Sequence, residues 1–254
     1  MTQVVYDGTM AGLLTAIFEV YDRRLDPVNI SQGKALQQDA FAQQMDVFTD
    51  ALKARRVWKG LSKKLPASAL DQFYFSFLSE NEGIENVMLA YARYVFSTDK
   101  NVSEDFGNQA VLTIVQTARK VWREKHRMEA FIRFQLLKDG LFYAAAEPDH
   151  NVLPLIIRHF RSRYADQDWL IYDARRKYGI YHPKTTGTVT EVKIDWSEEV
   201  RENSEAAYEP HEPLYQMLWK DYFHSTGIPA RNNKKLHLQH MPVRYWKYLT
   251  EKQH

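Results

Sequence analysis

The sequence contains no cysteine, which excludes disulfide bonds, thiolate nucleophiles, thiolate zinc sites and cysteine-ligated iron–sulfur clusters from this polypeptide. It also lacks any run of about 20 apolar residues, the length that a membrane-spanning helix requires. The apolar stretch 10–20 carries Glu19 and has no Lys or Arg before it, so it does not have the form of a signal peptide. We therefore expect a cytoplasmic protein that has no membrane partner.

The chain as a whole has no large excess of either charge, but two of its segments do. The net charge is +2, from 34 Lys and Arg against 32 Asp and Glu. Residues 195–212 contain seven acids and one base, whereas residues 231–254 contain six bases and one acid. Blocks of opposite sign either pair within the molecule or face different partners, and the sequence leaves both interpretations open.

The composition, 44% hydrophobic and 26% charged, is ordinary for a globular protein, and apolar spacing predicts its elements. Apolar residues three and four apart predict helices over 70–77, 84–95 and 111–122. From 128 to 134 the period changes to two, which predicts a strand in a hairpin with 141–145. A helix over 152–164 and a three-strand meander over 169–172, 178–181 and 188–194 follow, then helices over 214–222 and 242–250.

These elements predict an α+β fold for 1–254 as a single domain. We expect a helix-rich part, 1–127, packed with a sheet-containing part, 128–254, whose sheet is antiparallel and followed by C-terminal helices.

The N-terminus predicts a strand, a turn and a helix capped by the Thr9 hydroxyl. Gly8 and Gly12 invite comparison with a phosphate-binding loop, but the spacing and the lysine of that motif are missing, so a capped helix is favoured. Residues 26–40 read as a loop and 45–49 as a strand, after which Asp50 can cap a further helix.

Candidate catalytic residues are Asp149 and His150, where a carboxylate lies beside an imidazole, together with His159. Asp149 is equally suited to cap the following helix, and no motif supplies a nucleophile. His237 and His240 have metal-like spacing only if helical, which Pro242 disfavours, and no third ligand is evident. We expect no metal and no other cofactor.

The C-terminal residues are the best candidates for nucleic-acid binding. Arg231, Lys234 and Lys235 form a basic loop, and Arg244, Lys247 and Tyr248 share one face of the following helix. Cations for phosphate beside rings for base stacking are typical of single-strand binding, although a merely solvated face fits the same pattern. Arg133, Arg175 and Arg176 are secondary candidates.

Several short motifs are shared with a known family. They are Asp139-Gly140-Leu-Phe-Tyr143, Glu147-Pro-Asp-His150, Trp169-Leu-Ile-Tyr-Asp173, and Leu236-His-Leu-Gln-His-Met-Pro242 followed by Arg244-Tyr-Trp246. With them the chain resembles a bacterial family of DNA metabolism and repair proteins whose activity is not established. The family's genes lie beside a radical S-adenosylmethionine protein assigned to DNA modification or repair, and some relatives are fused to a uracil-DNA-glycosylase-like domain.

The resemblance implies an accessory protein in DNA repair or modification, which binds DNA and acts with a separate radical S-adenosylmethionine protein. The partner must be separate because this chain has no cysteines to ligate the radical enzyme's cluster. Two alternatives stay open. One is an enzyme with its own pocket around Asp149, His150 and His159, and the other is an adaptor that binds its partner through acids such as Glu198, Glu199 and Glu202 without contacting nucleic acid.

Overall fold

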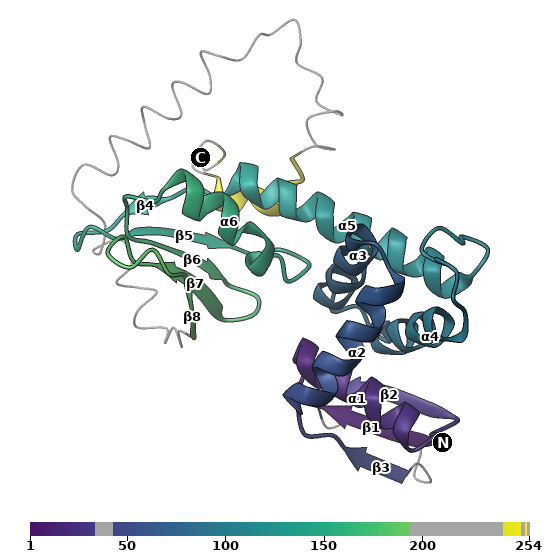
Figure 1. Ribbon diagram of the computed structural model, residues 1–254. Coiled ribbons are helices and arrows are strands. Elements are labelled where there is room, and N and C mark those ends of the chain that lie inside the picture. The colour runs from purple at the N-terminus through teal and green to yellow at the C-terminus, as the bar shows by residue number, and fades with distance from the viewer. Residues whose placement is uncertain (34–42, 194–240, 250–251, 253–254) are drawn as a thin grey trace, which may run out of the picture. The chain divides into compact units, whose positions relative to one another are not determined.

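The computed structural model describes residues 1–33, 43–193, 241–249 and 252. It divides into two compact units, Met1–Trp122 and Arg123–His254, shown in Figure 1. Both units combine helices with a sheet, so the predicted α+β class is confirmed. That they form one domain stays a prediction. Within the described residues, no helix has the length and apolar character needed to cross a bilayer.

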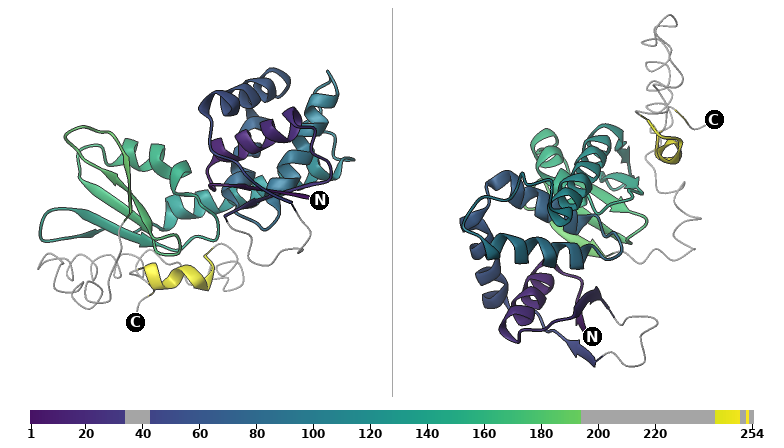
Figure 2. Two further views of the ribbon diagram at one scale, coloured as in Figure 1. Left: turned by 90° about the horizontal axis from the view of Figure 1, so that it is seen from below. Right: turned by 90° about the vertical axis from the view of Figure 1, so that its right-hand side faces the viewer.

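The first unit begins with a parallel sheet in the order β2-β1-β3. As expected, Thr9 caps the first helix, its hydroxyl accepting the Gly12 N–H at 2.9 Å. That helix lies across one face of the sheet (Figure 2). The elements are β1 (Thr2–Tyr6), α1 (Met10–Asp22), β2 (Val28–Gln32) and β3 (Gln43–Asp46).

Strand β2 corrects the loop that was expected over 26–40. Strand β3 overlaps the strand expected at 45–49 only at Met45 and Asp46, because it begins at Gln43 and ends at Asp46. The sequence hides β2 because Ile30 is its only fully buried residue, with the polar Asn29 and Ser31 beside it. Val28 and Ile30 do alternate with Asn29 and Ser31, but two apolar residues make too short a pattern to distinguish a strand from a loop.

The outer edge of β2 is bonded by a side chain from α4. The Asn86 Oδ1 accepts the Ile30 N–H at 2.8 Å, and the Asn86 Nδ2 donates to the Ile30 carbonyl at 3.2 Å. The amide side chain thus makes the pair of hydrogen bonds that a neighbouring strand would otherwise make.

Helices complete the first unit, and their apolar stripes form its core as predicted. Leu61, Phe73, Met88 and Ile114, one from each helix, are all buried. Asp50 caps the first of these helices, accepting the N–H groups of the second and third helical residues. The helices are α2 (Ala51–Lys64), α3 (Ala67–Leu78), α4 (Ile84–Ser97) and α5 (Gln109–Phe131), and the last of these continues into the second unit from Arg123.

The strand predicted over 128–134 is wrong, because α5 continues to Phe131. Met128 and Ile132 are both buried, and their spacing of four residues fits one face of a helix as well as one face of a strand. Four alternating apolar residues were too few to separate the two periods.

The second unit contains a sheet in the order β4-β5-β6-β7-β8. A hairpin is present, but its first strand is β4 and not the predicted 128–134. The expected meander is present as antiparallel pairs, whereas β5 and β6 run parallel because α6 connects them as a crossover. The elements are β4 (Gln135–Leu136), β5 (Phe142–Ala146), α6 (Leu153–Arg163), β6 (Trp169–Asp173), β7 (Tyr178–His182) and β8 (Thr190–Lys193).

The helix expected over 242–250 is a short 3₁₀ helix, η3 (Val243–Tyr248), which also belongs to the second unit. Tyr245 is its buried residue, and Leu249, which follows it, is buried too. The helix expected over 214–222 lies outside the described residues.

Candidate nucleic-acid interface

A buried carboxylate on α5 organises the surroundings of η3. Glu124 is 2% exposed, and its two oxygens accept the backbone N–H groups of Asp149 and His150, each at 2.8 Å. The Tyr245 hydroxyl donates to the same carboxylate at 2.6 Å. Burial, reinforced by this hydrogen bond, raises the pKa of Tyr245, so the phenol stays protonated as a donor. Glu124 therefore joins α5, the loop before α6, and η3.

Two of the predicted phosphate contacts are bound to carboxylates. Arg244 lies 3.3 Å from Glu124 and also forms an ion pair with Asp149. Lys247 forms an ion pair with Glu147, whose carboxylate also accepts the hydroxyl of Tyr248 at 2.9 Å. These acids neutralise cations that the sequence assigns to nucleic acid.

The ion pair between Lys247 and Glu147 affects the pKa of Glu147. Its hydrogen bonds, from Lys247 first and from Tyr248 second, hold the pKa of Glu147 below its ordinary value. The acidic block 195–212 and the predicted contacts Arg231, Lys234 and Lys235 lie outside the described residues. Nucleic-acid binding by the six predicted residues stays a prediction.

The secondary candidates also bind the protein's own backbone. Arg176 donates to the carbonyls of Pro148 and Asp149 at 3.1 and 2.9 Å, and forms an ion pair with the buried Asp173. Arg175 donates to the Asp149 carbonyl at 3.0 Å, and Arg133 donates to the carbonyls at the end of α5. These guanidinium groups hold the loop between β5 and α6, and the turn after α5.

The candidate catalytic residues are only partly brought together. Asp149 and His150 meet at Glu124, with the His150 Nε2 at 3.9 Å from that carboxylate. His159 instead lies beside Glu129, 3.9 Å from its carboxylate. The Asp149 carboxylate forms an ion pair with Arg244. It does not cap α6, whose N-cap is Val152.

No cluster of three or more metal-ligating side chains occurs among the described residues. His237 and His240 fall in the part that is not described.

A stronger cationic surface lies on α2, for which the sequence analysis predicted only a helix cap. This helix contains six Lys and Arg and no Asp or Glu. Two of the six are paired, Lys53 with Glu19 at 2.5 Å and Lys64 with Asp99 at 2.9 Å. The other four are exposed and form no ion pair with any described residue; we call them the α2 cationic face: Arg55, Arg56, Lys59 and Lys63.

Helical spacing explains why these charges share one surface. Arg56, Lys59 and Lys63 follow one another at intervals of three and four residues, opposite the buried Ala54 and Leu61. The period of 3.6 residues in the charges was the signal that would have identified this face from the sequence.

Helix α6 carries a smaller set of the same kind. Arg158, Arg161 and Arg163 are exposed, α6 contains no acid, and none of the three forms an ion pair with a residue in the described ranges. Arg163 lies over the Tyr164 ring, 5.8 Å from its centroid. These three arginines can therefore serve as a control for the α2 cationic face, because they are exposed cations of the same kind in the second unit.

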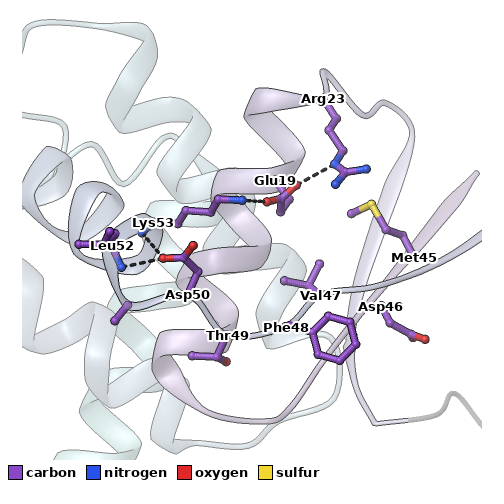
Figure 3. A pocket seen from close by; sticks show the side chains of 11 residues that line it. Glu19, Arg23, Met45, Asp46, Val47, Phe48, Thr49, Asp50, Leu52 and Lys53 are labelled. Atoms are coloured by element: carbon purple, nitrogen blue, oxygen red, sulfur yellow. Dashed lines mark hydrogen bonds and ion pairs between the residues drawn. The ribbon is translucent and has the colours of Figure 1, made fainter.

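A cavity of about 580 Å³ opens beside the start of α2. Its walls come from α1, from β3 and the turn after it, and from the first turn of α2. Figure 3 shows Lys53 and Arg23 reaching Glu19 from opposite sides. Phe48 and Leu52 line the same cavity and are 87% and 79% exposed.

Comparison with known proteins gives a family without an assigned activity. No curated protein matches the chain. A solved structure described as a pGpG-specific phosphodiesterase, PggH from Vibrio cholerae, aligns with 71% of this chain and 80% of its own at 12% identity. Its TM-score of 0.28 is too low to support an argument. The model of a domain of unknown function, DUF4130, matches residues 82–251, so this chain belongs to the DUF4130 family.

Proposed function

We propose that this protein is an accessory nucleic-acid-binding protein in DNA repair or modification, acting with a separate radical S-adenosylmethionine protein. The observation that carries nucleic-acid binding is the α2 cationic face, whose four charges form no ion pair with any described residue. The role in repair and the enzyme partner rest on the sequence motifs that the chain shares with DNA metabolism and repair proteins.

The arrangement of these charges favours a linear polyanion. From Arg56 to Lys63 the cations extend about 10 Å along the helix, at a rise of roughly 1.5 Å per residue. A compact phosphate ligand requires donors that converge on one point, whereas a nucleic-acid backbone presents its phosphates in a row. Binding to such a backbone releases counterions and therefore weakens as salt is added.

The test compares three variants that each remove three positive charges. One replaces Arg56, Lys59 and Lys63 by Gln, the second replaces Arg158, Arg161 and Arg163 by Gln, and the third replaces Arg231, Lys234 and Lys235 by Ala. Affinity for labelled single- and double-stranded DNA is measured across a salt series. We expect the α2 variant to reduce the salt slope most, by up to about 2 on single strands, since each lost contact contributes about 0.7.

Each outcome has a definite meaning. Equal losses in all three variants would reduce the effect to net charge and contradict a specific role for α2. A loss confined to the third variant would place binding at Arg231, Lys234 and Lys235. No binding by the unmodified protein at low salt would overturn the proposal and favour an adaptor, whose complex with a partner protein should then fail when Glu198, Glu199 and Glu202 are neutralised.

A further inference from the structure

Phe48 is the most exposed large apolar side chain among the described residues. The chain on both sides of it is held in place. The preceding Val47 is buried and donates its N–H to the Val5 carbonyl at 2.8 Å, and the following Thr49 donates its hydroxyl to Asp7 at 2.6 Å. The ring is therefore presented to solvent by a backbone segment that is held on both sides, which lowers the entropy cost of stacking a ligand on it.

The cavity beside this ring combines an apolar platform with polar walls. Leu52 and Met45 extend the apolar surface, whereas Asp46, Asp50 and the Glu19 ion pairs supply charged and hydrogen-bonding groups; all of these residues line the cavity. A purely apolar occupant would desolvate those polar groups without satisfying them. A nucleobase has an aromatic face for Phe48 and polar edges for the walls.

The cavity also adjoins the α2 cationic face. Leu52 and Lys53, from the first turn of α2, line the cavity, and the cationic face begins two residues later at Arg55. A strand whose phosphates follow α2 reaches Phe48 at the N-terminal end of the helix. Cations along the backbone with an aromatic ring at one end are the elements from which single-strand sites are built.

We propose that this cavity is a stacking subsite for an unpaired nucleobase, with Phe48 as the ring that the base covers. The proposal rests on the proposed function and narrows its ligand to nucleic acid with a single-stranded stretch.

The experiment uses two oligomers of equal length and charge, oligothymidylate and a fully abasic deoxyribose-phosphate chain. Affinities are measured for the unmodified protein, Phe48→Ala, Phe48→Trp and a matched control, Phe106→Ala, whose ring is 51% exposed in the same unit. We expect Phe48→Ala to weaken oligothymidylate binding about 5- to 150-fold, the range for losing one stacked base, and to leave the abasic chain unaffected. Phe48→Trp should retain affinity, and the indole emission should be quenched on binding.

The outcomes separate this subsite from the proposed function. If Phe48→Ala changes neither oligomer while the α2 variant weakens both, nucleic-acid binding stands and the subsite is wrong. Equal weakening of both oligomers by Phe48→Ala would also overturn base stacking. No binding of either oligomer by the unmodified protein overturns both proposals. If Phe48→Ala abolishes a complex with a partner protein and leaves oligomer binding intact, the occupant of the cavity is a side chain of that partner, and the nucleobase subsite is wrong. Unfolding curves of each variant verify that the fold is retained.

Discussion

Arg56 on α2 and Arg244 on η3 are the same residue type in opposite circumstances. Arg56 lies on an exposed helix face, above the Phe18 ring at 5.6 Å, and its helix contains no acid. Arg244 is bound to Glu124, a residue 120 positions away, and to Asp149. Charge density along a sequence therefore does not measure charge available to a ligand, because the neutralising partner is set by the tertiary fold.

The largest effect is expected from removing Glu124, the buried carboxylate that binds Arg244 and Tyr245. Glu124→Ala leaves the buried Tyr245 hydroxyl and two backbone N–H groups without their acceptor, at a cost of about 3 kcal/mol in the free energy of unfolding. Urea unfolding measures the change. Glu129→Ala, which breaks ion pairs with Lys125 and His126, is the control and should cost less. A loss below that of the control would show that Glu124 is not the anchor of η3.

The α2 cationic face depends on an ordered first turn. Asp50→Ala removes the acceptor for the Leu52 and Lys53 N–H groups and should lower stability by about 1 kcal/mol, measured by thermal unfolding. Asp50→Asn keeps a capping oxygen without the charge, so it should cost much less. Equal costs for the two variants would mean that the charge of Asp50, rather than its cap, stabilises α2.

The difference between Arg56 and the paired C-terminal cations can also be tested by removing the carboxylates that pair with those cations. The double variant Glu147→Gln and Asp149→Asn removes carboxylates that contact Lys247 and Arg244. Both cations lose one carboxylate, although Arg244 keeps its contact with Glu124. If pairing is what keeps them from DNA, affinity for single-stranded DNA at low salt should rise and the salt slope should become steeper. Asp168→Asn, which removes one carboxylate beside Lys184, is the control for losing an acid elsewhere in the same unit, and it should raise the affinity less. Unchanged affinity in the double variant would exclude these two cations from the interface.

The smallest effect concerns Glu19 at the wall of the cavity. Hydrogen bonds from Lys53, then from Arg23, lower the pKa of Glu19 below its ordinary value of 4.5. A lowered folded-state pKa adds stability that is present above that value and is lost as the pH falls through the folded-state pKa. Glu19→Gln should therefore flatten the acid limb of stability between about pH 5 and pH 2 in unfolding measurements. An unchanged limb would mean that these ion pairs contribute nothing.

The sequence predicted those features of the fold that depend on residues within one or two helical turns of each other. The caps at Thr9 and Asp50, and the stripes of α3 and α4, needed only neighbouring residues. Strand β2 was missed because it is stabilised by the strand beside it and by Asn86.

The candidate site likewise combines features set by neighbouring residues with features set by the tertiary fold. Asp149 and His150 were singled out by adjacency, but Glu124, which bonds both of their backbones, comes from a distant helix. The pairing of Arg244 and Lys247 was likewise a property of the fold. The α2 cationic face, in contrast, was present in the sequence as a regular period of charges and could have been predicted there.

The amide of Asn86 has a consequence for self-association. Unpaired N–H and C=O groups at the rim of a sheet are a template on which another chain can add a strand and begin to aggregate. With the Ile30 groups already taken by Asn86, an incoming strand at β2 would meet an interrupted ladder at the middle of its length. One polar side chain thereby protects the sheet against templated growth on that side, without the bulk of an additional covering element.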